Sequence, residues 1–113
     1  MTYTDSGGMP MKTVTICGSM RFAEQMQHIA FELEALNGWN VLQCVYDTPG
    51  THLTQEMLNR LKAAHFAKID LSDAIYVVDI GGYVGEAVRE EIKYAKSRQI
   101  DVIYHSKAIK EGF

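Results

Sequence analysis

The chain has 113 residues, of which 47% are hydrophobic, and this is enough for the core of one compact domain. The net charge is −3 with acidic and basic residues interspersed, which argues against a protein that wraps nucleic acid but not against one that binds a small anion. No apolar run approaches the roughly 20 residues of a membrane span and no signal-peptide pattern is present, so we expect a cytoplasmic protein without a membrane partner.

The first half of the chain predicts a leader, a strand and a helix. Residues 1–11 show no periodicity and predict a mobile leader before a single domain over residues 12–113. Thr13–Cys17 is a β-branched run that stops at Gly18, as is typical of a buried strand. A helical apolar spacing follows and leads to a C-cap signal at Asn37-Gly38. Its members are Phe22, Met26, Ile29, Leu33 and Leu36.

The second half continues this alternation. The same criteria predict a strand over Asn40–Tyr46, a turn over residues 47–50, and a helix over Leu53–Ile69 with Thr54 as its N-cap. A strand over residues 74–78, a glycine-rich loop, a helix to about residue 95 and a strand over residues 101–104 come next. The remaining tail is too short to add much.

Alternating strands and helices predict an α/β fold with a mostly parallel sheet. We expect a small doubly wound sheet, flavodoxin-like or Rossmann-like, of four to five strands in the order 2-1-3-4. A single sheet of this size covers its apolar helix faces only in part, so we expect a homodimer or a larger homo-oligomer. The two cysteines, Cys17 and Cys44, are too few for a disulfide framework and lack the spacing of metal ligands. We interpret both as buried thiols, and expect neither a metal nor a cofactor.

Glu91 is the leading catalytic candidate because it lies on the apolar side of its helix. At about 100° per residue, six apolar side chains form one arc, and Glu91 falls within it. They are Val84, Ala87, Val88, Ile92, Tyr94 and Ala95. An ionised carboxylate there loses hydration unless another group pairs with it. The alternative is a boundary glutamate whose head reaches water.

Two loops should border the site, since ligands of open α/β sheets bind at the carboxyl ends of the strands. In Gly18-Ser19-Met20-Arg21, the glycine allows a tight turn while Ser19 and Arg21 offer donors beside a helix N-terminus, which predicts an anion pocket. The alternative is that Ser19 is an ordinary N-cap and Arg21 a surface charge. In the glycine-rich loop, Gly82, Tyr83 and Gly85 are expected to face the ligand.

Four further residues are assigned to the same edge. His65 shares a face with the apolar residues of its helix, and beside Glu91 it would serve as proton donor or orienting partner, the alternative being a core histidine. Asp79 ends the central strand and is expected to hold sugar hydroxyls. Tyr46 and Asp47 follow the second strand and are expected to line a base or sugar pocket, although loop polarity explains them equally well.

These segments together resemble the nucleoside 2-deoxyribosyltransferase superfamily. The matching segments are Cys17-Gly18-Ser19-Met20-Arg21, Ser72-Asp73 before a β-branched central strand, and the glycine-rich loop that leads to Glu91-Ile92-Lys93-Tyr94-Ala95. The resemblance spans about Thr13 to Tyr104. It is nearest to the nucleoside 5′-monophosphate N-glycosidase branch and to short bacterial and phage-type members.

The resemblance implies a retaining double displacement at an N-glycosidic bond. A helix-borne glutamate, matched by Glu91, attacks the anomeric carbon, the nucleobase departs, and water or a second base takes the sugar. Ser19 and Arg21 match the loop that contacts the 5′-phosphate. We therefore expect an N-glycosidase or 2-deoxyribosyltransferase whose partner is a small molecule, a nucleoside or nucleoside 5′-monophosphate, and not a nucleic acid.

The chain departs from the family pattern at three places. His65 stands where the family usually has an aspartate that interacts with the base, and Thr15 stands where the nucleotide-cleaving branch has a tyrosine. Gly85 and Ala87 occupy a loop that bears a serine in that branch. Two other functions remain open: a nucleotide-binding or sensing module without turnover, and an enzyme that cleaves a dinucleotide such as NAD.

Overall fold

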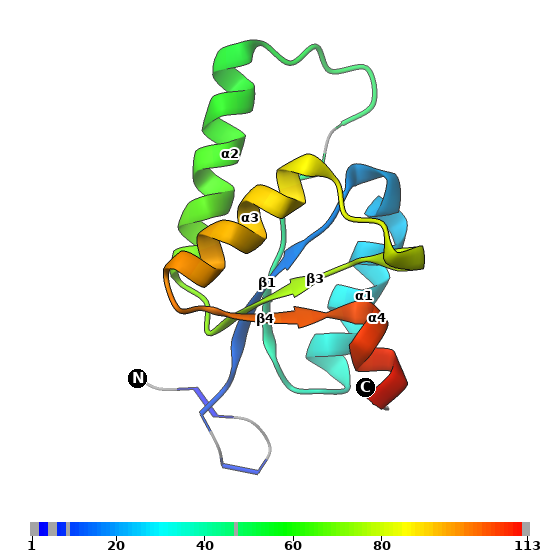
Figure 1. The fold of residues 1–113 in the computed structure, drawn as a ribbon, viewed down its shortest axis with the longest axis vertical. Coiled ribbons are helices and arrows are strands. Elements are labelled where there is room, and N and C mark those ends of the chain that lie inside the picture. The colour runs from blue at the N-terminus through cyan, green and yellow to red at the C-terminus, as the bar shows by residue number, and fades with distance from the viewer. Residues whose placement is uncertain (1–2, 5–6, 9, 47, 112–113) are drawn as a thin grey trace.

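A four-stranded, all-parallel sheet forms the centre of the molecule (Figure 1). The computed structural model describes residues 3–4, 7–8, 10–46 and 48–111. The sheet has the order β2-β1-β3-β4. Its strands are β1 (Thr13–Cys17), β2 (Asn40–Leu42), β3 (Ala74–Val77) and β4 (Asp101–Tyr104). The predicted α/β fold and strand order are thereby confirmed.

Helices cover both faces of this sheet (Figure 1). One face packs against α1 (Ala23–Ala35) and the short α4 (His105–Ala108), and the other packs against α2 (Gln55–Asp70) and α3 (Glu86–Ser97). In the part of the chain that the structure describes, three 3₁₀ turns join these elements, namely η1 (Met20–Phe22), η2 (Ile80–Gly82) and η3 (Ile109–Glu111). The described residues include no helix that is long and apolar enough to cross a bilayer.

The core is split between the two faces because successive side chains of a strand point to opposite sides. Val14, Ile16 and Tyr76 pack on the α1 side, together with Met26, Ile29 and Leu33 of that helix. Cys17, Ile75 and Val77 pack on the other side, against Ile69 of α2 and Val88 and Ala95 of α3. This alternation directs Cys17, the last residue of β1, toward the helices that carry His65 and Glu91.

Two helix ends match their sequence signals. The Thr54 hydroxyl accepts a hydrogen bond from the Met57 amide at 3.1 Å and caps α2, as predicted. At the end of α1, Gly38 has a φ of 72° and its amide bonds to the carbonyl of Glu34, as in an αL cap, while the Trp39 amide bonds to the carbonyl of Leu33. These ends fix where the chain enters α2 and leaves α1.

Other boundaries differ from the sequence prediction. The second strand ends at Leu42 rather than Tyr46, because the carbonyl of Gln43 accepts a hydrogen bond from the Lys68 ammonium at 2.9 Å. Leu36 lies beyond the last turn of α1 and is 77% exposed, so its assignment to the buried face is wrong. Ala87 is exposed as well and is not part of the buried arc of α3.

Both ends of the chain carry local structure. Within the predicted leader, Thr4 and Pro10 form an isolated antiparallel bridge. The tail, which the sequence suggested adds little, forms α4 and buries Ala108 against the α1 side of the core. α4 therefore takes part in the fold.

Candidate active site

Glu91 and His65 meet between α3 and α2. The Nε2 atom of His65 lies 3.3 Å from the Glu91 Oε1 atom, and the two side chains are only 12% and 15% exposed. Glu91 is therefore turned inward, as the helical spacing indicated, and is not a surface glutamate. Because Nε2 faces the carboxylate, the imidazole tautomer that is protonated there donates a hydrogen bond to Glu91.

Cys17 completes this cluster from the end of β1. Its Sγ atom lies 3.5 Å from His65 Nε2 and within 4.8 Å of a Glu91 carboxylate oxygen. The thiol is fully buried, and burial, followed by the nearby Glu91 carboxylate, raises its pKa well above the ordinary range. Cys17 therefore stays protonated near neutral pH, and its thiol and the His65 imidazole both lie beside one carboxylate.

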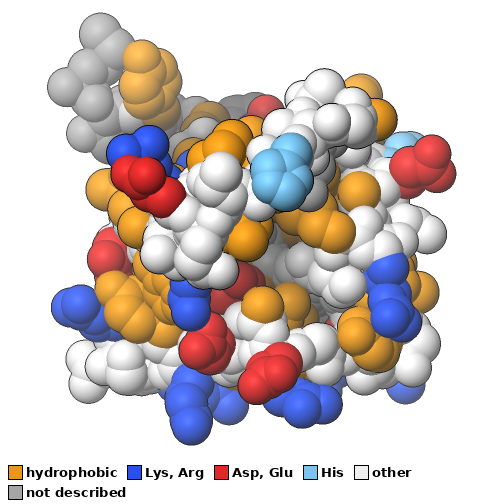
Figure 2. Space-filling view, turned by 90° about the horizontal axis from the view of Figure 1, so that it is seen from above, with side chains coloured by type: hydrophobic (Ala, Val, Ile, Leu, Met, Phe, Trp, Pro, Cys, Tyr) orange, Lys and Arg blue, Asp and Glu red, His pale blue; other side chains and the backbone are white. Residues whose placement is uncertain are grey.

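The cluster borders a cavity of about 240 Å³ at the carboxyl end of the sheet. Glu91, His65, Gly18 and Met20 line it, and the rest of the wall is mostly apolar. Those apolar residues are Ile16, Val45, Leu53, Leu58, Leu61 and Ala64. A second hollow of about 360 Å³ shares Val45, Leu53 and Leu61 with the first and is also lined by Tyr46. Viewed from above, the surface is hollowed near its centre, with charged side chains around the depression (Figure 2).

Two lysines contribute positive charge to this cavity. Lys62 and Lys68 both line it, three residues before and after His65 on the same face of α2. Lys62 forms an ion pair with Glu90 at 2.9 Å, and Lys68 donates to the carbonyl of Gln43. The cavity therefore combines one inward carboxylate with a cationic side, an arrangement suited to a ligand with an electrophilic centre and a negative group.

The predicted anion loop packs against the glycine-rich loop. The Ser19 side chain accepts a hydrogen bond from the Arg21 amide at 3.3 Å and caps η1, which is the simpler of the two readings of that serine. The Arg21 guanidinium lies 4.0 Å from the centre of the Tyr83 ring, and Phe22 meets the same ring edge to face. Neither Arg21 nor Tyr83 is among the residues that line the Glu91 cavity.

Three further predicted residues, Asp79, Gly82 and Gly85, are not among those that line the Glu91 cavity. Both oxygens of Asp79 are bonded to Ser106, one to its amide at 2.8 Å and one to its hydroxyl at 2.7 Å, so this carboxylate is held by α4 instead of facing the cavity. Gly82 and Gly85 flank Tyr83, and Gly85 is the N-cap residue of α3. Asp47 lies outside the described residues.

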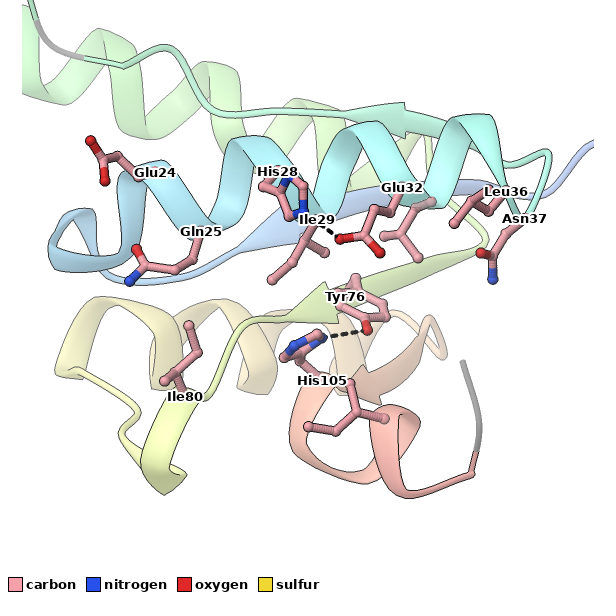
Figure 3. Close-up of a pocket in the computed structure, with 12 residues that line it drawn as sticks. Glu24, Gln25, His28, Ile29, Glu32, Leu36, Asn37, Tyr76, Ile80 and His105 are labelled. Atoms are coloured by element: carbon pink, nitrogen blue, oxygen red, sulfur yellow. Dashed lines mark hydrogen bonds and ion pairs between the residues drawn. The ribbon is translucent and has the colours of Figure 1, made fainter.

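A separate cavity of about 560 Å³ lies on the opposite face of the sheet, between α1, β3 and α4 (Figure 3). Figure 3 shows His105 and Tyr76 pointing toward each other at its edge, where the tyrosine hydroxyl and His105 Nδ1 are 2.7 Å apart. Glu24 and Glu32 also line this cavity. Their negative charge opposes the binding of a phosphate, so we place the candidate active site at Glu91.

Comparison of the chain with family models, curated proteins and solved structures finds no significant match.

Sequence reasoning did not identify Cys17 or the two lysines as part of the site. The signal for Lys62 and Lys68 was available, because residues three positions from His65 on a helix share its face. No local signal links Cys17 to residues 48 and 74 positions later in the chain. Only the packing of β1 under α2 and α3 brings them together.

Proposed function

We propose that the protein cleaves or transfers the N-glycosidic bond of a nucleoside or nucleoside 5′-monophosphate, with Glu91 as the nucleophile. The observation that carries this proposal is the position of Glu91, an inward carboxylate that borders a cavity at the carboxyl end of a parallel sheet. Among the described residues, the groups beside it are a thiol and an imidazole and not a lysine or arginine. Such a carboxylate is poorly hydrated and keeps its charge available for a carbon that develops positive charge.

The reaction proceeds in two displacements. A Glu91 oxygen forms a bond to the anomeric carbon while the carbon–nitrogen bond breaks, and the base leaves with the bonding electron pair and takes up a proton from solvent water. Water or a second base then attacks the anomeric carbon of the glutamyl ester, and the glycosyl carbon–oxygen bond breaks to regenerate Glu91. Two inversions at one carbon retain its configuration.

In this proposal His65 positions the nucleophile. Its Nδ1 atom is buried without a hydrogen-bond partner among the described residues, and its Nε2 atom faces Glu91 and Cys17. Neither nitrogen is directed at a departing base. The imidazole instead holds one carboxylate oxygen and leaves the other free for attack.

The two joined hollows fit the two halves of such a substrate. The smaller hollow holds a sugar against Glu91, and the larger one receives the base beside Tyr46. Burial raises the pKa of the Tyr46 phenol to about 12, so the ring stays neutral and suited to stacking on a base. Lys62 and Lys68 supply donors for a phosphate at the side of the sugar.

A substrate panel tests this proposal. Purified protein is incubated with ribo- and 2′-deoxyribonucleosides, their 5′-monophosphates and NAD, with and without a second free base, and free and exchanged bases are separated by chromatography. We expect base release from at least one nucleoside or monophosphate, and exchange if transfer is the natural reaction. Release of nicotinamide from NAD alone would replace the proposed substrate class, and absence of base from every compound would overturn the proposal.

A binding module without turnover is the second candidate function. It is favoured by the absence, among the described residues at the cavity, of a second carboxylate that could protonate a departing base. This function predicts that a nucleotide raises the melting temperature, that no base is released, and that Glu91→Gln binds as tightly as the parent. Loss of binding in Glu91→Gln would exclude it.

A further inference from the structure

Three side chains that are typical metal ligands converge at the base of the Glu91 cavity. They are the Cys17 thiol from β1, the His65 imidazole from α2 and the Glu91 carboxylate from α3, and their donor atoms all lie within 4.8 Å of one another. The sulfur–nitrogen distance is 3.5 Å and the nitrogen–oxygen distance is 3.3 Å. Each ligand comes from a different element of the core, so the geometry of the three is fixed by the fold.

Two of these separations, sulfur to nitrogen and nitrogen to oxygen, match tetrahedral coordination of zinc. With a Zn–S bond of about 2.3 Å and Zn–N and Zn–O bonds of about 2.0–2.1 Å, a tetrahedral ion holds its ligand atoms roughly 3.3–3.6 Å apart. Because Glu91 and His65 both line the cavity, we place the fourth position of the ion on the cavity side. Three protein ligands with one open position are the usual composition of a zinc site that also binds water or another small ligand.

We propose that Cys17, His65 and Glu91 bind one thiophilic divalent cation of the zinc class, and that this ion reversibly blocks the site. The binding follows from the three ligands themselves. The blocking rests on the proposed function, because it requires Glu91 to be the nucleophile.

Charge and protons balance on binding. The buried Cys17 thiol loses its proton to solvent as the sulfur bonds to the ion, and one thiolate and one carboxylate then neutralise the two positive charges. Binding therefore releases protons and tightens as the pH rises. A hard cation such as Mg²⁺ prefers oxygen ligands and does not compete for this set.

The affinity is limited by the second coordination shell. When Nε2 of His65 binds the ion, the ring proton resides on Nδ1, which is buried and has no acceptor among the described residues. Zinc-bound histidines usually donate that proton to a carboxylate or carbonyl, and loss of such a partner typically costs 10–100-fold in affinity. The site is thus expected to exchange its ion with solution and not to hold it as a permanent structural ion.

Cobalt titration tests the binding directly. The full chain is treated with a chelator, exchanged into metal-free buffer and titrated with Co²⁺, whose thiolate bond gives a charge-transfer absorption band. We expect a band that saturates at one ion per chain and is displaced by Zn²⁺ but not by Mg²⁺. Cys17→Ala should abolish the band, and His65→Ala and Glu91→Gln should each weaken binding at least about tenfold.

Cys44→Ser and Glu90→Gln are the matched controls. Cys44 lines the same cavity but does not belong to the cluster, and Glu90 precedes Glu91 with its carboxylate on Lys62. Both variants should bind cobalt like the wild type, and circular dichroism confirms that each variant is folded. No band, or a band that survives in Cys17→Ala and is lost in Cys44→Ser, would overturn the site.

Inhibition is measured separately on whichever substrate releases base. Zinc should reduce the wild-type rate, a chelator should restore it, and Cys17→Ala should show an at least tenfold higher inhibition constant relative to its own zinc-free rate. Cobalt binding without inhibition of base release would overturn the block and leave the metal site standing. If no substrate is cleaved, the proposed function fails while the spectroscopic result still decides the metal site.

Discussion

The surroundings of Glu91 hold its carboxylate without neutralising it. The adjacent residue, Glu90, forms an ion pair with the Lys62 ammonium at 2.9 Å. Among the described residues, Glu91 instead lies beside the imidazole of His65 and the thiol of Cys17. An ammonium paired with Glu91 would stabilise its charge and lower its reactivity toward carbon. Of these two neighbouring carboxylates, Glu90 therefore joins α3 to α2, and Glu91 faces the cavity.

Substitution of His65 tests its role as a positioning residue. We expect His65→Ala to lower kcat by about 10²-fold with little change in KM, because the carboxylate loses the donor that fixes its orientation. His65→Gln should recover part of kcat, since its amide can donate to the same oxygen without titrating. A proton donor to the base would instead be rescued poorly by glutamine, and the acidic limb of its kcat–pH profile would shift.

For individual residues, the sequence predicted which side chains point inward better than it predicted their contacts. The wheel of α3 identified Glu91 as inward, and the face of α2 identified His65, because both signals are local and periodic. The assignment of Asp79 to sugar hydroxyls depended only on its position after a strand. It could not take account of Ser106, which comes 27 residues later and bonds both oxygens of this carboxylate.

Between elements, the pairing of α2 with α3 builds the site. Phe66 and Tyr94 pack edge to face with ring centres 4.7 Å apart, and the Tyr94 hydroxyl donates to Asp70 at 2.7 Å. The Lys62–Glu90 and His65–Glu91 pairs also join α2 to α3. The Glu91–His65 pair therefore lies within a packed helix–helix contact, which limits its motion.

Substitution of Gly18 tests the packing of the loop between β1 and α1 against Met26 and Val78. A Cβ atom at residue 18 would lie 2.6 Å from the Met26 sulfur and 3.2 Å from the Val78 Cβ. We expect Gly18→Ala to lower the free energy of unfolding by about 1–3 kcal/mol, as overpacked cores do. The control is Gly85→Ala, whose nearest neighbour would be 3.5 Å away at an ordinary φ of −75°. Chemical denaturation measures both, and equal stability of the two variants would contradict this packing.

Element ends were the least predictable part of the fold. Residues Asn40–Tyr46 have a continuous strand pattern in the sequence. The Lys68 ammonium of α2 nevertheless donates a hydrogen bond to the Gln43 carbonyl, and β2 ends at Leu42. Likewise, α4 is four residues long and carries no detectable periodicity. Tertiary contacts determine both, and a single sequence does not reveal them.

Over the whole molecule, the two faces of the sheet differ in chemistry. The α2–α3 face carries the cavity with lysines, and the α1–α4 face carries the cavity with Glu24, Glu32 and His105. The expected homo-oligomer stays a prediction, and sedimentation measurements at several protein concentrations would determine the oligomeric state.

His105 predicts how stability depends on pH. Burial lowers its pKa below the ordinary 6.5, and this outweighs the opposite effect of the Asp79 and Glu32 carboxylates. The unfolded chain then binds more protons at this residue than the folded chain, so stability rises with pH. The contribution is complete above about pH 6.5 and is lost as the pH falls from there through the lowered pKa of the folded protein. We expect His105→Asn, whose amide oxygen can still accept from Tyr76, to show a shallower fall between about pH 7 and pH 5.

The control for this prediction is His52→Asn, at an exposed loop residue. It should leave the slope of unfolding free energy against pH unchanged. Thermal or urea unfolding over the pH series gives these slopes, and a His105→Asn slope equal to that of the wild type would show that this histidine is not linked to folding.

The most direct test of the account compares two adjacent carboxylates. Glu91→Gln and Glu90→Gln are assayed for base release on the best substrate, with melting temperatures to confirm that both are folded. We expect Glu91→Gln to lose more than about a thousandfold in kcat/KM, because the amide is not a nucleophile, and Glu90→Gln to stay within about twofold of the wild type. Undiminished activity in Glu91→Gln would contradict the assignment of Glu91 as the nucleophile.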